Sequence, residues 1–197
     1  FAPSKQRMRG RRAAITAFND LSHVIKRGIA LTPVKFGISF NTTFLNQAGA
    51  LVHVYTDGSV HLNHGGTEMG QGLNTKVAQI VAHEFQVDFS EIKITATTTG
   101  KVPNTSATAA SSGTDLNGKA AQAAARTIKG RMAAYLASLH GCAAEDVIFA
   151  NGMVIAGDTH MDFAAAVEAC YLGRVSLSST GFYATPKIHW DKSRSRG

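Results

Sequence analysis

The sequence predicts an α+β fold in which the order hairpin, helix, strand occurs twice, over residues 50–98 and 146–183. Two-residue turn signals, Asp57-Gly58 and Asn151-Gly152, stand between strand-like segments. A segment with apolar residues at helical spacing follows each hairpin. With 44% apolar residues in 197, the chain can bury one sizeable core rather than two. The repeated order favours a duplicated α+β unit.

The elements can be assigned in order along the chain. Apolar residues spaced for one face predict a helical arm from Ala13 to Val24. Gly173 is placed to end the last helix. After the arm we expect strands near 35–44, a hairpin at 50–64, a helix at 69–87, a strand at 91–98, a helix at 115–139, a hairpin at 146–156, a helix at 162–172 and a strand at 174–183.

Positive charge is concentrated at the two ends of the chain. Residues 1–12 and 187–197 together carry +8, so the rest carries −1 of the total of +7. We therefore expect a basic tail at 1–12, a partial domain at 13–186 and a second basic tail at 187–197, with any disorder confined to the tails. A basic folded face is not predicted, which argues against nucleic-acid binding.

The most informative segment is the glycine-rich run Gly65–Gly72, which leads into a helix. A helix start leaves backbone N–H groups without intrahelical partners and carries partial positive charge, so it favours anions. Gln71 stands where a P-loop needs lysine, and Thr75 stands where a dinucleotide fingerprint needs its third glycine. The alternative is a turn that binds nothing.

A second run of small residues, Thr105–Thr114, precedes the long alanine-rich helix. Hydroxyls and small side chains at a helix start can cap the backbone, and they also let a polar ligand lie against the main chain. A simple Ser/Thr cap is the alternative.

Several phrases of the chain, in order and at fitting spacing, resemble the molybdenum-cofactor part of the xanthine dehydrogenase family. The likeness covers roughly residues 6–191. The phrases lie at residues 35–40, 44–50, 53–60, 65–72, 102–111, 115–118 and 175–183.

The resemblance implies roles for particular positions. The loop would lie against molybdopterin, and larger side chains beside the molybdenum would fill the pocket. Phe40 would pack edge-on against a flat purine, and Asn41 stands where mammalian members carry threonine. The implied cofactor-binding residues are Gly70, Gln71, Gly72, Ala110, Ser111 and Ser112; the implied substrate-pocket residues are Phe40, Asn41 and Ala109; and the backbone of Ala110 would lie near the metal.

The implied activity is hydroxylation of hypoxanthine and xanthine to urate, with electrons passing to iron–sulfur clusters, FAD and NAD. The family's catalytic base is a glutamate in a Gly-Glu-Pro-Pro segment, and no Gly-Glu or Glu-Pro pair occurs here. Glu68 at a helix start and Glu84 on a packed helix do not fit the role. We therefore expect no catalytic residue in this chain, which reads as an inactive fragment of a larger enzyme.

The expected partners are the remainder of the molybdenum domain, the FAD and 2Fe–2S parts and a purine substrate, without a membrane. Cys142 and Cys170 lack the spacing of a metal site, and free thiols favour the cytoplasm. Three alternatives stay open: another molybdenum hydroxylase of the aldehyde oxidase kind, a phosphate- or nucleotide-binding module without redox chemistry, and a purely structural domain.

Overall fold

The computed structural model describes residues 2–32 and 40–197. The chain divides into two compact units, Phe1–Gly37 and Ile38–Gly197. The division expected from the sequence, with a partial domain at 13–186, stays a prediction. All strands of the described residues belong to the larger unit.

The smaller unit contains helix α1, Ala2–Leu21. Residues 2–12, expected as a basic tail, are part of this helix, so the predicted helix start at residue 13 is wrong. Lysine, arginine, glutamine and methionine are all good helix formers, which explains the longer helix. The segment after α1 contacts the end of this helix: Asn19 Oδ1 accepts the backbone N–H of Arg27 at 2.8 Å, and the Arg27 guanidinium lies 3.7 Å from the centre of the Phe18 ring.

The predicted hairpin around Asp57-Gly58 is confirmed. Strands β1, Gln47–Val54, and β2, Val60–His64, pair in antiparallel register. Gly58 takes a left-handed conformation with φ +85°. Asp57 Oδ1 accepts the backbone N–H of Ser59 at 2.9 Å, which fixes the turn.

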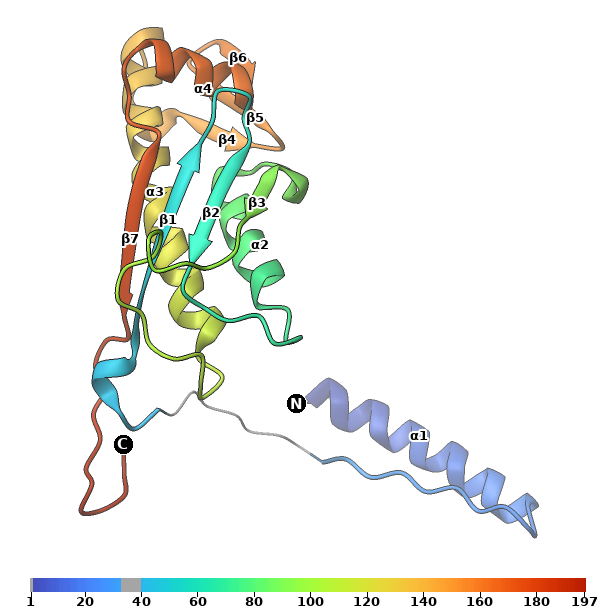
Figure 1. Ribbon diagram of the computed structural model, residues 1–197. Coiled ribbons are helices and arrows are strands. Elements are labelled where there is room, and N and C mark those ends of the chain that lie inside the picture. Colours follow the sequence, from blue (N-terminus) through green and yellow to red (C-terminus); the bar gives the residue numbers. More distant parts are fainter. Residues whose placement is uncertain (1, 33–39) are drawn as a thin grey trace. The chain divides into compact units, whose positions relative to one another are not determined.

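The main sheet has four strands in the order β3-β2-β1-β7 (Figure 1). Strand β3, Ile92–Ile94, is parallel to β2, and β7, Ser178–Ala184, is antiparallel to β1. Alternate side chains of β1 are buried on the face that the helices cover. They are Ala48, Ala50, Val52 and Val54.

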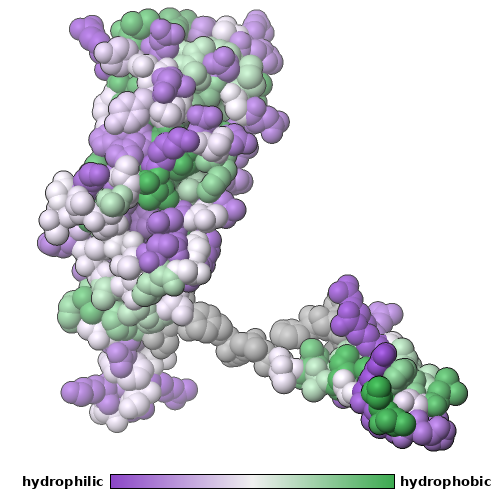
Figure 2. All heavy atoms as spheres, turned by 45° about the vertical axis from the view of Figure 1, so that its right-hand side comes forward, coloured by the Kyte–Doolittle hydropathy of each residue, from purple (hydrophilic) through white to green (hydrophobic). Residues whose placement is uncertain are grey.

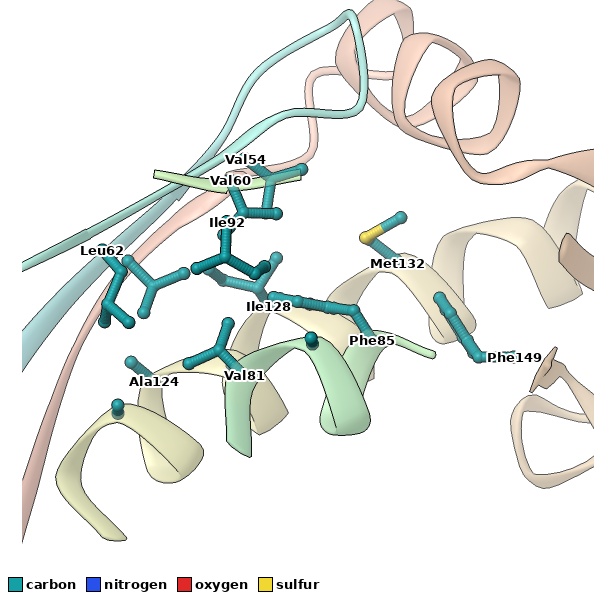
Figure 3. Packing of buried hydrophobic residues seen from close by; sticks show 14 of the residues in the cluster. Val54, Val60, Leu62, Val81, Phe85, Ile92, Ala124, Ile128, Met132 and Phe149 are labelled. Atoms are coloured by element: carbon teal, nitrogen blue, oxygen red, sulfur yellow. The ribbon is translucent and has the colours of Figure 1, made fainter. Parts of the chain in front are cut away.

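Helices α2, Leu73–Phe85, and α3, Gly113–His140, lie on one face of this sheet (Figure 1). Their buried side chains meet those of the strands in the main core (Figure 3). Each large apolar side chain buried there contributes about 1.5–3 kcal/mol. The core includes Val54, Val60, Leu62, Val81, Phe85, Ala124, Ile128 and Met132.

Two contacts fix α3 against its neighbours. Toward the sheet, a Cβ on Gly181 of β7 would lie 2.0 Å from the carbonyl oxygen of Ala120, so only glycine allows this approach. Toward α2, Glu84 accepts hydrogen bonds from Arg126 and Gln122, each at 3.1 Å. Glu84 is therefore a helix-pairing residue.

A second, smaller sheet has the order β4-β5-β6. The hairpin of β4, Ile148–Ala150, and β5, Met153–Ala156, turns at Asn151-Gly152 as predicted. Strand β6, Thr159–Asp162, was not predicted, since its four residues show no strand-like alternation of apolar character. Helix α4, Phe163–Leu172, follows, with Asp162 capping the N–H of Ala165 at 2.7 Å.

The α+β prediction is confirmed, but the two hairpin-helix-strand units are not two structural copies. The first unit keeps its strands in one sheet, whereas β7 leaves the second hairpin and pairs with β1. The order repeats and the pairing does not.

Two further expectations differ at the edges of the larger unit. Residues 40–44 do not form a strand, and 35–39 lie outside the described residues. The basic segment 187–197 turns back on itself, with Asp191 and Arg196 exchanging backbone hydrogen bonds of 2.7 and 3.1 Å. The short 3₁₀ helices of this unit are Thr43–Leu45, Phe89–Glu91 and Ala144–Asp146.

Hydrophilic and hydrophobic residues are interspersed over the face of the larger unit that Figure 2 shows. No helix in residues 2–32 or 40–197 has both the length and the apolar character to cross a bilayer.

Candidate functional site

The structure brings together the two small-residue segments that sequence analysis singled out. We name Gly65–Gly72 the first entrance, because it leads into α2, and Thr105–Thr114 the second entrance, because it leads into α3. The backbone N–H of Thr67 donates to Thr108 Oγ1 at 2.8 Å. A Cβ on Gly65 would lie 2.2 Å from the side chain of Thr105, so the two segments approach too closely for any residue but glycine at position 65.

Gly66 joins the first entrance to the core. A Cβ there would lie 2.5 Å from Leu73 and 2.9 Å from the Asn117 amide. His64 Nδ1 accepts the backbone N–H of Gly66 at 3.1 Å, which places the ring proton of the neutral imidazole on Nε2. The first entrance is thus anchored to β2 and α3.

Two buried polar atoms beside Gly66 have no hydrogen-bond partner among the described residues. They are Nε2 of His64 and Oδ1 of Asn117, on side chains that are 2% and 5% exposed. Burial lowers the pKa of His64 and outweighs the opposing influence of Asn74 and Glu68. His64 is therefore neutral at pH 7.

The side chain of Glu68 fills the mouth of the first entrance. Its Oε1 accepts the backbone N–H groups of Gly70 at 2.9 Å and Gly72 at 3.0 Å. Its Oε2 accepts the N–H of Asn74 at 2.9 Å. These hydrogen bonds, with that of Asn74 the strongest influence, hold the pKa of this exposed carboxyl below its ordinary value.

The side chain of Gln71 also closes on the loop. Its Nε2 donates to the carbonyl oxygen of Thr67 at 2.9 Å, and its Oε1 accepts the N–H of Met69 at 2.6 Å. Gly70 and Gly72 have φ of +92° and +73°, which favours glycine at both positions. Residues 67–71 are exposed, so a ligand can reach this loop from solvent.

The second entrance is shaped by strained backbone. Ala110 and Ser111 have φ of +54° and +57° although neither is glycine, and such positions cluster at functional sites. Ser112 is buried and donates from Oγ to the carbonyl oxygen of Ala109 at 2.9 Å. Ala109 and Ser111 are exposed and Ala110 is half-buried, so this segment also presents main chain to solvent.

Two of the three predicted substrate-pocket residues, Phe40 and Asn41, lie together at a cavity of about 400 Å³, which Ala109 does not line. Asp115 and Trp190 contribute to the same cavity. Asp115 also lines a neighbouring cavity of about 420 Å³ together with Ser111. Phe40 and Asn41 are therefore close to the second entrance, linked to it through the first turn of α3.

Sequence reasoning missed three features of this site. Glu68 is rejected there as a catalytic base because it stands at a helix start, but the hydrogen bonds of its carboxylate to the loop are not predicted. The acid two residues before Gly70 and four before Gly72 was the available signal. The Thr67–Thr108 contact and the buried His64 could not be found, because each depends on residues that only the fold brings together.

No three His, Cys, Asp or Glu side chains gather into a metal site within the part of the chain that the structure describes. Apart from the Glu68 carboxylate, the two entrances offer backbone and small or neutral polar groups instead. Such a surface fits a class of protein: an α+β domain with room for a bulky polar ligand against its main chain.

The chain belongs to the molybdopterin cofactor-binding domain family, whose sequence model matches residues 2–197. It is homologous to the molybdopterin-binding part of xanthine dehydrogenases and related molybdenum hydroxylases. The resemblance inferred from the sequence phrases is confirmed.

The relatives are much longer than this chain. A xanthine dehydrogenase of Oryza sativa subsp. japonica is 47% identical over 186 residues, which cover 94% of this chain and 12% of the relative. A xanthine dehydrogenase/oxidase of Felis catus is 47% identical over 91% of this chain and 12% of its own length. The chain thus spans about an eighth of the length of these relatives.

Solved structures agree with the fold. Quinoline 2-oxidoreductase from Pseudomonas putida 86 superimposes with a TM-score of 0.65 at 26% identity, covering 71% of this chain and 19% of that one. CO dehydrogenase from Oligotropha carboxidovorans gives a TM-score of 0.65 at 23% identity over 72% of this chain and 19% of that one, which supports the fold alone.

Molybdenum–molybdopterin is the cofactor of this family, and the site can be tested against it. The exposed small residues fit a large polar ligand, since a Cβ on Gly70 would meet nothing within 4 Å. The backbone N–H groups of the loop are not all free to bind the cofactor. The N–H groups of Gly70 and Gly72 already donate to Glu68.

Proposed function

We propose that this chain supplies one wall of the molybdopterin site of a xanthine dehydrogenase-type molybdenum hydroxylase. The observation that carries the proposal is the direct contact between the two entrances, Thr67 N–H to Thr108 Oγ1 at 2.8 Å, in a chain of this family. The residues that would line the wall are Gly70, Gln71, Gly72, Ala110, Ser111 and Ser112, with Ala110 nearest the metal.

The cofactor, when bound, supplies the oxidative hydroxylation of a purine carbon. This chain would bind the cofactor and shape the pocket for the substrate. The amide of Gln71 keeps one N–H and one oxygen lone pair beyond its hydrogen bonds within the loop, and these can face the cofactor. The methyl side chain of Ala109 leaves room for a flat substrate, and Phe40 and Asn41 lie at the neighbouring cavity.

We assign the substrate to the purines because the relatives over most of this chain are xanthine dehydrogenases. Iron–sulfur and FAD parts and the rest of the molybdenum domain would be its partners. Without a Gly-Glu-Pro-Pro segment, the chain brings no catalytic base to the reaction. Both cysteines are free, which suits the cytoplasm. The family match does not favour a non-redox phosphate or nucleotide module.

The test is a chimera in which this chain replaces the matching segment of the rice xanthine dehydrogenase. We expect the chimera to carry molybdenum and pterin, and Gln71→Ala to lower the content of both several-fold. Gln79→Ala, a change of the same type at an exposed position of α2, is the control and should leave both unchanged. A wild-type chimera without cofactor, or equal content in both variants, contradicts the proposal.

A further inference from the structure

The first entrance holds an anion of its own. A glycine-rich loop that opens a helix is usually an anion site, because several N–H groups converge there. Here three such groups, those of Gly70, Gly72 and Asn74, converge on the carboxylate of Glu68 at 2.9–3.0 Å. The position that a ligand phosphate would take is filled by a side chain of the same loop.

The match between this carboxylate and the loop is close. An ionised carboxylate accepts about four hydrogen bonds, and its bonds to backbone N–H groups are stronger than neutral ones. Its negative charge also lies at the positive end of α2. The left-handed conformations of Gly70 and Gly72 turn their N–H groups toward the same oxygen.

The rest of the loop is closed from the other side. Gln71 joins Thr67 to Met69, and Thr108 of the second entrance holds the N–H of Thr67. With Glu68 in place, the backbone from 67 to 74 has its shape before a ligand arrives. A ligand would therefore contact the outer surface of the loop and the free N–H and oxygen lone pair of the Gln71 amide. The N–H groups of Gly70, Gly72 and Asn74 already donate to Glu68.

We propose that Glu68 is a positioning residue that serves as the internal anion of the cofactor loop, so that the cofactor is not held by the backbone N–H groups of Gly70 and Gly72. The part that concerns the cofactor rests on the proposed function. The part that concerns the loop depends only on this chain, and the two can be tested separately.

Amide hydrogen exchange of the 197-residue chain tests the loop. We expect Glu68→Ala to lower the protection of Gly70, Gly72 and Asn74 at least about tenfold, while Val77 and Val81, deeper in α2, keep theirs. Glu68→Gln keeps one acceptor oxygen and should lie between wild type and Glu68→Ala. Glu145→Ala, which removes an exposed glutamate from a 3₁₀ helix, is the control.

Unchanged protection at the three amides in Glu68→Ala overturns the proposal, and so does an equal loss at Val77 and Val81, which would indicate general unfolding. Inorganic phosphate gives a second test. Added phosphate should leave the Gly70 and Gly72 amide signals of the wild-type chain in place and move them in Glu68→Ala. Movement in the wild-type chain would show that the N–H groups are open to anions.

The cofactor arm uses the chimera. If the wild-type chimera loads and Glu68→Ala loses molybdenum and pterin several-fold while Glu68→Gln retains an intermediate amount, Glu68 positions the cofactor loop. If the wild-type chimera loads and Glu68→Ala loads equally, the positioning role is wrong and the proposed function stands. A wild-type chimera that fails to load contradicts the proposed function alone, because the exchange result stands without it.

Discussion

The two entrances both contain left-handed backbone ahead of a helix, but different residue types and interactions hold it in place. The first uses glycine where its backbone is left-handed, at Gly70 and Gly72, and fixes that flexible loop with the side chains of Glu68 and Gln71. The second places alanine and serine in left-handed conformations, at Ala110 and Ser111, and its hydrogen bonds involve hydroxyl groups. Polar side chains hold the first loop in a conformation that glycine tolerates, whereas the second loop has strained backbone at residues other than glycine.

The difference shows which loop depends on the other. The hydrogen bonds of Glu68 and Gln71 lie within residues 67–74, so this part of the first entrance is held mainly by its own side chains. Backbone strain persists only where surrounding structure imposes it. The second entrance is held by the start of α3 and by its contact with Thr67, and both supports can be removed by mutation.

The largest effect is expected from disturbing the close contact between α3 and strand β7 of the main sheet. A Cβ in Gly181→Ala would lie 2.0 Å from the carbonyl oxygen of Ala120 and 2.6 Å from the N of Ala124, so α3 must move from the sheet. We expect a loss of about 3 kcal/mol in urea unfolding of the chain.

Gly130→Ala is the matched control for this change. A Cβ there meets nothing within 4 Å, and the position is inside α3, so the substitution should stabilise by about 0.5–1 kcal/mol. Equal effects of the two substitutions would show that the close approach of α3 to the sheet does not stabilise the fold.

A smaller effect is expected from separating the two entrances. Thr108→Val keeps the shape of the side chain but removes the oxygen that accepts the Thr67 N–H. We expect a loss of about 1 kcal/mol in urea unfolding, with faster amide exchange at Thr67. If exchange at Thr67 stays at the wild-type rate, the entrances are not joined through this bond.

Opposite signs are expected from exchanging alanine and glycine between the entrances. Gly70→Ala should destabilise the chain by about 1 kcal/mol because φ is +92°. The loss should not be larger, since no neighbour obstructs the new methyl group. Ala110→Gly should stabilise it by up to about 1 kcal/mol by relieving a φ of +54°. The same sign in both variants would remove the distinction between the two loops.

The smallest effect is expected from pH, and only at the first entrance. The pKa of His64 is lowered by burial and that of Glu68 by hydrogen bonds. In each case the unfolded loop binds protons more readily, so stability is lost as pH falls. Protection factors at Gly66 should fall below about pH 6.5 and those at Gly70 and Gly72 below about pH 4.5. A parallel fall at Ser112 would contradict this localisation.

Local patterns predicted much of the fold and less of the site. Asp57-Gly58 and Asn151-Gly152 located both hairpins, because their turn chemistry is local. The pairing of β7 with β1 could not be predicted, since the pair is separated by over 120 residues and no local signal specifies it. The entrances were found from glycine and hydroxyl runs, whereas the Thr67–Thr108 bond required the fold.

The central claim is that both entrances form one wall of a molybdopterin site, and an experimental structure of the molybdenum-loaded chimera tests it most directly. We expect the cofactor to lie within hydrogen-bond distance of Gln71 and to contact the backbone of Ala110–Ser112, with Glu68 still bound to the N–H groups of Gly70 and Gly72. A cofactor that contacts only one entrance, or neither, would contradict the account.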